Sequence, residues 1–147
     1  KKSAVLKQLD IEGSGCWTEN PETRYFSGTR SYISKVDIPE FTGNLFLDLG
    51  EVYNLAQILI DGQEVCTLWK APFKTDISDY IKGKKNIELE IKVTNLWVNH
   101  LIGDAMKGPS QRSSYVSSEF YNGTEPLQKS GLLGPVVLIE TTSRSND

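Results

Sequence analysis

The chain has 147 residues, of which 38% are hydrophobic and 24% charged, and its formal net charge is −3. This size and composition suit one domain with an apolar core. No basic cluster occurs beyond Lys82, Lys84 and Lys85, so no nucleic-acid partner is expected. No apolar run approaches the ~20 residues that a membrane-spanning helix needs, so no membrane span is expected either.

Glycine, asparagine and proline interrupt residues 1–23, and their apolar patch is confined to residues 5–9. This pattern predicts a lead-in segment with at most a short strand. A single domain is expected over residues 24–147. Because the sequence lacks an initiator methionine, we expect this domain to be a fragment of a larger enzyme.

Apolar, β-branched and aromatic residues indicate a series of short strands in the rest of the chain. The predicted strands cover residues 24–38, 44–49, 56–60, 63–69, 86–94 and 135–142, with a corner at 131–134. Asp61 and Gly62 separate two of them, which is a strong signal for a type I′ hairpin. Residues 75–83 suit a single helical turn that is capped by Thr75 or Asp76 and stopped by Gly83.

Residues 86–104 join the clearest strand to a polar and aromatic segment. Apolar residues occupy every second position from Ile87 to Val93, which is the period of a half-buried strand. Residues 103–130 have no sustained period, and a loop of this length binds something, lines an interface or is disordered. Short strands with almost no helix predict an all-β fold, an antiparallel β-sandwich of about eight strands.

Three motifs carry a resemblance to a known family: YFSGT at 25–29, NLWVNHLIGD at 95–104 and SGLLGPV at 130–136. In this order they resemble the β-sandwich sugar-binding module of glycoside hydrolase family 2, in the version attached to α-L-rhamnosidase-like enzymes of glycoside hydrolase family 106. One departure is His100, where the resemblance leads us to expect Arg. A neutral His side chain has one hydrogen-bond donor, whereas the planar guanidinium group of Arg has several.

The resemblance implies a galactose-binding-like jelly roll that serves as an accessory module of a larger secreted or periplasmic glycoside hydrolase. Its implied partners are carbohydrate and the catalytic domain of the same parent chain. In family 2 enzymes the catalytic carboxylates lie on a separate barrel domain. No catalytic residue is therefore expected in this piece.

Sugar binding needs flat apolar faces for the ring and planar hydrogen-bonding groups at its rim. The candidate sugar-binding residues are Trp97, Asn99, His100, Asp104, Tyr115, Tyr121 and Arg30. The alternative is that Trp97 packs in the sandwich, that Asn95 and Asn99 satisfy backbone groups, and that Arg30 is an ordinary edge-strand charge. Trp69 is expected to pack inside the sandwich.

Catalysis and metal binding are less favoured by the residue pattern. Of the acids near the predicted loop, Asp104, Glu119 and Glu125 could converge for hydrolysis, but loop acids are more often solvated. His100 lacks a GxSxG nucleophile motif as a partner.

No cofactor is required by the pattern. A structural Ca²⁺ is compatible with the resemblance, with Asp48, Glu51, Asp61, Asp76 and Glu140 as conceivable donors. Cys16 and Cys66 lack zinc-type spacing and are expected to be free thiols.

Two functions stay open on this basis. The chain is either a carbohydrate-binding accessory module or a purely structural module that packs against the catalytic domain. An autonomous binder is expected to expose at least two aromatic side chains on a concave face or a loop rim. A packing module is expected to expose an apolar patch larger than a few hundred Å² where its partner was removed.

Overall fold

The computed structural model of the chain describes residues 2–95 and 126–143. Its strands are β1 (Lys2–Leu9), β2 (Thr29–Asp37), β3 (Asn44–Asp48), β4 (Glu51–Tyr53), β5 (Leu55–Ile60), β6 (Gln63–Leu68), β7 (Lys74–Asp76), β8 (Asn86–Thr94), β9 (Gly131–Gly134) and β10 (Val136–Thr142). Two single 3-10 turns, η1 (Trp17–Glu19) and η2 (Ser78–Tyr80), complete the elements of the described part.

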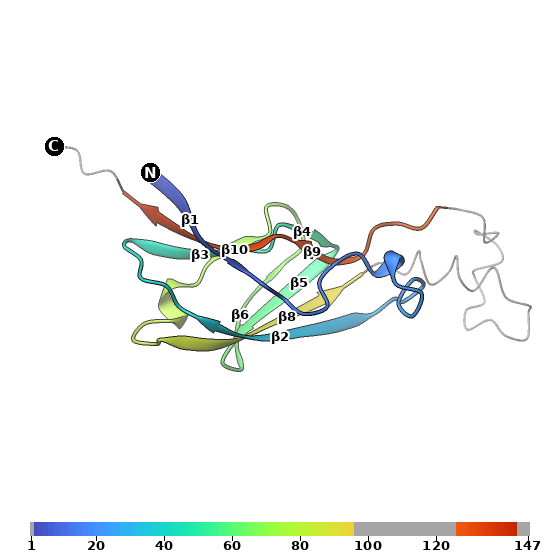
Figure 1. Ribbon diagram of the computed structural model, residues 1–147, viewed down its shortest axis with the longest axis horizontal. Coiled ribbons are helices and arrows are strands. Elements are labelled where there is room, and N and C mark those ends of the chain that lie inside the picture. The colour runs from blue at the N-terminus through green and yellow to red at the C-terminus, as the bar shows by residue number, and fades with distance from the viewer. Residues whose placement is uncertain (1, 96–125, 144–147) are drawn as a thin grey trace, which may run out of the picture.

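The strands form two four-stranded sheets, in the orders β1-β10-β3-β7 and β2-β8-β5-β6, and a small β4-β9 pair. The paired strands run antiparallel throughout the described residues. Figure 1 shows the two larger sheets as two layers, with β2 and β8 in one and β1, β3 and β10 in the other. The predicted antiparallel β-sandwich is confirmed.

The core lies between the two layers. Along β8, buried apolar residues alternate strictly with more exposed ones. Its four alternate apolar residues, Ile87, Leu89, Ile91 and Val93, are all buried. Pairing with β5 places Leu89 beside Ile60, Ile91 beside Ile58 and Val93 beside Ala56. Burial of each large aliphatic side chain stabilises the fold by ~1.5–3 kcal/mol relative to exposure. Leu45, Leu47, Val136 and Leu138 supply the facing layer.

The hairpin between β5 and β6 has the predicted turn. Asp61 and Gly62 both have positive φ, at 49° and 80°, as a type I′ turn requires. The Asp61 carboxylate accepts hydrogen bonds from the Glu88 backbone N–H and from Lys84 Nζ, at 2.8 and 2.6 Å. The hairpin is thereby joined to the start of β8.

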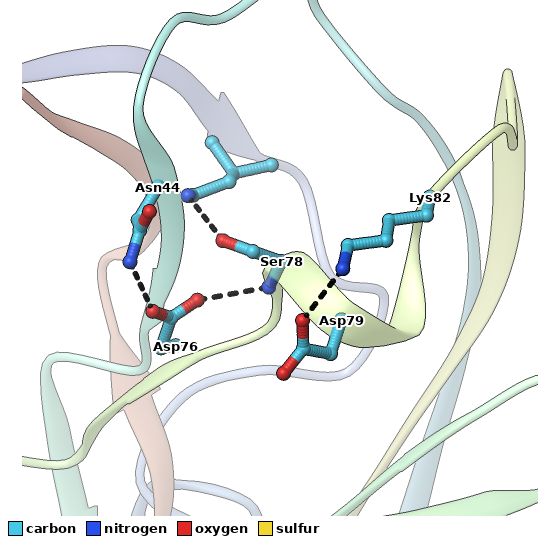
Figure 2. Close-up of polar contacts among 6 residues, drawn as sticks. Asn44, Asp76, Ser78, Asp79 and Lys82 are labelled. Atoms are coloured by element: carbon cyan, nitrogen blue, oxygen red, sulfur yellow. Dashed lines mark hydrogen bonds and ion pairs between the residues drawn. The ribbon is translucent and has the colours of Figure 1, made fainter.

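The predicted single helical turn is η2, and Asp76 fixes its first residue. Figure 2 shows the Asp76 carboxylate between Asn44 and Ser78. It accepts hydrogen bonds from the Ser78 backbone N–H at 2.9 Å and from Asn44 Nδ2 at 2.7 Å. Ser78 Oγ in turn accepts the Leu45 N–H at 2.9 Å, which attaches the turn to β3. The nearby Asp79–Lys82 ion pair is highly exposed and contributes little.

The N-terminal segment contributes more to the sandwich than the sequence predicts. Instead of at most a short strand, β1 runs for eight residues and pairs with β10. Only Leu9 of β1 is buried, so an edge strand of this kind has no apolar alternation to reveal it. Ile11 and Trp17, also before residue 24, belong to the core.

Two other predictions differ from the structure. The strand predicted over residues 24–38 begins only at Thr29, because Tyr25 and Phe26 belong to the loop that precedes it. The corner predicted at 131–134 forms β9, which pairs with β4. Both strands are too short, at four and three residues, for a periodic pattern.

Trp69 does not pack inside the sandwich as predicted, but is 70% exposed. The preceding strand, β6, lies at the edge of one sheet and ends at Leu68, and the following strand, β7, lies at the edge of the other sheet. Trp69 therefore begins a connection between sheets and has no facing layer to cover it. The fully buried Trp of the described residues is Trp17.

Within the described ranges, no helix has the length and apolar character needed to cross a membrane.

The two described tryptophans provide a matched test of these assignments. Trp17→Ala removes a buried ring and its hydrogen bond to Tyr32, so we expect a loss of ~3–5 kcal/mol in unfolding free energy. Trp69→Ala alters an exposed side chain and is expected to change that value by less than ~0.5 kcal/mol. Urea unfolding measures both. Equal losses would contradict the burial of Trp17 and the exposure of Trp69.

The Asp76 contacts predict a pH-dependent contribution to stability. Partial burial works to raise the pKa of Asp76, but hydrogen bonds from Ser78 and Asn44 outweigh it and hold that pKa below its ordinary value. The ionised form therefore stabilises the fold above the unfolded-state pKa of about 3.9, and this contribution is lost as pH falls through the folded-state pKa. Asp76→Asn lacks the titration. The gap in unfolding free energy between the two proteins should shrink from pH 7 to about pH 2.5; a constant gap would contradict this account.

Candidate functional site at the Trp17 end of the sandwich

The predicted binding residues follow β8, so the candidate site lies where β8 ends and β2 begins. Thr29 pairs with Thr94 at this end, and their hydroxyl oxygens lie 2.7 Å apart. Residues 11–28 and 130–133 pack around the same end, with Trp17 between them. We call this region the Trp17 end.

Trp17 anchors the loops of this end to the core. It is 2% exposed, and its Nε1–H donates to the Tyr32 hydroxyl at 2.6 Å. Its backbone N–H donates to the Ser130 carbonyl at 3.0 Å, which joins the N-terminal segment to the start of β9. Phe26 meets the Trp17 ring edge to face, with 5.1 Å between ring centroids. Trp17 thus joins these loops to the core through both its ring and its backbone.

Gly131 is required by the close approach of Trp17. A Cβ at residue 131 would lie 2.7 Å from ring atoms of Trp17, and the φ of Gly131 is +100°. No larger residue fits this backbone without displacing the ring. Packing against Trp17 therefore explains why the first glycine of the SGLLGPV motif is a glycine.

Asn95 closes the end of β8 by binding the loop before β2. Its side-chain oxygen accepts the Gly28 N–H at 2.9 Å, and its Nδ2 donates to the Phe26 carbonyl at 2.7 Å. Its own backbone N–H donates to the Gly28 carbonyl at 3.2 Å. The side chain is buried, so the interpretation that Asn95 satisfies backbone groups is confirmed.

Arg30 is the predicted sugar-binding residue that falls within the described part of the chain. Its position pairs with Val93, on the core-facing side of the sheet. The guanidinium carbon lies 5.2 Å from the centroid of the Tyr32 ring, a cation–π arrangement. Its Nη2 also lies beside Gly13, where a Cβ would be 2.7 Å away. Arg30 forms no ion pair with the other described residues.

The other predicted site residues lie outside the described residues. They are Trp97, Asn99, His100, Asp104, Tyr115 and Tyr121, together with the acids Glu119 and Glu125. Their proposed roles stay predictions.

A cavity of about 500 Å³ lies beside the Trp17 end, and the sequence did not reveal it. It is lined by Gln8, Leu9, Asp10, Ile11, Ser14, Leu133, Gly134, Pro135 and Val136. Three of these, Gln8, Asp10 and Ser14, carry polar side chains that form no hydrogen bond with other described residues. Most of the polar lining comes from the segment interpreted as a lead-in, where no motif marked it.

Cys16 lies next to Trp17 and is a free thiol, as is Cys66, so that prediction is confirmed. Partial burial works to raise the pKa of Cys16. Hydrogen bonds from the Thr18 hydroxyl and from the backbone of Ser130 and Thr18 outweigh this effect and lower that pKa. The Cys16 sulfur lies 3.0 Å from the Thr18 hydroxyl oxygen.

The conceivable calcium donors do not converge. Both carboxylate oxygens of Asp61 and of Asp76 already accept hydrogen bonds from neighbouring groups. Asp48 and Glu140 each accept a backbone N–H, from Gly50 and Thr42 respectively. In the part of the chain that the structure describes, no three His, Cys, Asp or Glu side chains lie close enough together to hold a metal ion. Calcium binding by this chain stays a prediction.

Comparisons with known proteins place the chain among glycoside hydrolase sequences. No family model matches it. It is 37% identical to a protein of Formosa agariphila, provisionally named a beta-glucuronidase, over 83% of this chain and 13% of that protein. The structure of a rhamnosidase from Novosphingobium sp. PP1Y aligns with 95% of the chain and 15% of its own length, at 32% identity and a TM-score of 0.81.

The chain resembles part of a glycoside hydrolase. It spans 13% and 15% of the lengths of these two relatives. A third structure, the GH2 beta-galacturonidase of Eisenbergiella tayi, aligns with 97% of the chain and 24% of its own length, at 21% identity and a TM-score of 0.56. At that identity the likeness concerns the fold alone, and it agrees with a β-sandwich domain.

The Asn95 contacts predict a stability effect with a built-in control. Asn95→Ala leaves the Gly28 N–H and the Phe26 carbonyl without partners, so we expect a loss of ~2–4 kcal/mol in unfolding free energy. Thr94→Ala removes a neighbouring exposed hydroxyl and should cost less than ~1 kcal/mol. Urea unfolding of both variants measures the difference. An Asn95→Ala loss no larger than that of Thr94→Ala would contradict the anchoring role.

Proposed function

We propose that this chain is a non-catalytic carbohydrate-binding accessory module of a larger, secreted or periplasmic glycoside hydrolase. The observation that carries the proposal is the match of 95% of the chain to 15% of a rhamnosidase, at a TM-score of 0.81. We further propose a galactose-binding-like jelly roll, a parent enzyme that is α-L-rhamnosidase-like or family 2-like, and a plant or host polysaccharide as its substrate.

The chemistry of the Trp17 end supports sugar binding. Sugar hydroxyls both donate and accept hydrogen bonds, so a site needs groups of both kinds beside an apolar surface. The guanidinium of Arg30, which forms no ion pair with the described residues, supplies donors. Asp10 and Gln8 supply acceptors in the adjoining cavity. Leu133 and Pro135 supply apolar lining. The predicted contacts from Trp97 to Tyr121 would add aromatic faces.

The same cavity argues against hydrolysis by this chain. Both glycosidase mechanisms need two facing carboxyl groups, ~5–5.5 Å or ~6.5–9.5 Å apart. Asp10 is the one carboxyl group among the lining residues. The described lining of this cavity therefore lacks the facing pair of carboxyl groups that either mechanism needs.

A second candidate function is a structural module that packs against a catalytic domain of the same parent chain. The 70% exposure of Trp69 favours it, because a large indole in solvent is a common interface residue. Phe26, at 37% exposure, is the other exposed aromatic of the described residues. Exposed aromatic side chains are also needed by an autonomous binder, so a binding measurement decides between the functions.

Isothermal titration of the chain with L-rhamnose, D-galactose and a pectin fragment tests the proposal. We expect heat with at least one of them and about tenfold weaker binding by Arg30→Ala, because a hydrogen bond from a charged donor is lost. Trp69→Ala should bind like the unaltered chain. Absence of heat with all three ligands would contradict sugar binding and support the packing role. Turnover of an aryl rhamnoside by the chain, above that of Asp104→Ala, would contradict the non-catalytic assignment.

A further inference from the structure

A second cavity, of about 850 Å³, lies at the opposite end of the sandwich. It is lined by Ile38, Pro39, Glu40, Phe41, Thr42, Ile81, Lys82, Gly83, Lys84, Lys85 and Glu140. Residues 38–42 follow the end of β2 at Asp37, and residues 81–85 precede the start of β8 at Asn86. Because Asp37 pairs with Asn86, these two loops are neighbours, far along the strands from Asn95.

The walls of this cavity are held in place by backbone contacts. The Ile38 N–H donates to the Lys85 carbonyl at 2.8 Å, which joins the two loops. The Thr42 N–H donates to a carboxylate oxygen of Glu140 on β10 at 3.1 Å. The contacts of Asp76 and Ser78 in Figure 2 fix η2, which leads into the second loop. The cavity is thus built by three elements before any ligand arrives.

Two of the three lysines that line the cavity form ion pairs with acids outside it. Lys82 pairs with Asp79 at 3.1 Å, and Lys84 pairs with Asp61 at 2.6 Å. Neither acid lines the cavity. Glu40 and Lys85 form no ion pair or side-chain hydrogen bond with the rest of the described chain. One carboxylate oxygen of Glu140 has no partner among those residues.

The free groups combine with an apolar floor. Phe41 and Ile38 are partly buried against the core, and Ile81 is 2% exposed. An aromatic face beside carboxylate acceptors and an ammonium donor matches a sugar ring, whose C–H face is apolar and whose hydroxyls both donate and accept. The volume falls within the ~300–1,000 Å³ range of ligand pockets.

We infer that this cavity is a second saccharide-binding site, for a neutral saccharide. Phe41 contacts the ring, Glu40 and Glu140 accept hydrogen bonds from its hydroxyls, and Lys85 donates one. With the paired acids Asp61 and Asp79 counted, four carboxylates lie at or beside the cavity against its three lysines. This excess of negative charge disfavours a uronate, because like charges repel. This inference rests on the proposed carbohydrate-binding function and adds a site at the opposite end from Arg30.

Titration of the ¹⁵N-labelled full chain with L-rhamnose, D-galactose and D-galacturonate, followed by amide chemical shifts, tests the site. We expect a neutral sugar to shift amides in residues 38–42 and 82–85, and D-galacturonate to shift them less at equal concentration. Glu140→Gln keeps an acceptor for the Thr42 N–H while removing the charge. It and Lys85→Ala should each weaken the response of these amides about tenfold.

Lys35→Ala is the matched control, since Lys35 is exposed on β2 and does not line the cavity. It should leave the response unchanged. Phe41 is not substituted in this experiment, because it packs against the core. Sugar-dependent shifts confined to residues 8–30 and 95 would overturn this site while leaving the proposed function intact. No shift in any amide would overturn both. A stronger response to D-galacturonate than to the neutral sugars would overturn the ligand class.

Discussion

Burial of one face of β8 is the constraint on which the rest of the structure depends. The strand lies between β2 and β5, and its alternate apolar side chains fill the space between the layers. A shift of one residue would turn that whole face to solvent, so the register is strongly specified. The register in turn fixes what stands at each end of the strand. Asn95 meets the loop of Phe26 at one end, and Lys85 meets Ile38 at the other.

The two ends of the sandwich are closed by different chemistry. At the Trp17 end a buried indole and a neutral amide satisfy backbone and hydroxyl groups, and such contacts do not change with pH in the ordinary range. At the other end carboxylates accept backbone N–H groups and pair with lysines. These exposed pairs add little stability. Asp79 and Asp61 offset part of the positive charge that Lys82 and Lys84 bring to the cavity.

The positions of strands with a buried face were predictable from the sequence. Alternation located β8 closely, and Asp61 with Gly62 located the hairpin, because both signals are local. Edge and very short strands were not predictable. β1 buries only Leu9, and β4 and β9 are too short to show a period. β1 pairs with β10, which lies more than a hundred residues later in the chain, and β4 pairs with β9, about eighty residues later.

The sequence by itself determined the strands with a buried face, the Asp61–Gly62 hairpin and the single turn at η2, since each of these depends on neighbouring residues. The contacts of Asn95 are with Phe26 and Gly28, which lie almost seventy residues earlier in the chain. Tertiary structure decided which tryptophan is buried. Trp17 stands in a segment without strand signals, yet the approach of Gly131 and Tyr32 encloses it. Trp69 stands in a strand-like segment, yet the sheet ends there and no strand of the described residues covers its side chain. Both cavities also arise from segments distant in sequence, because a cavity is a property of packing between elements that no local pattern encodes.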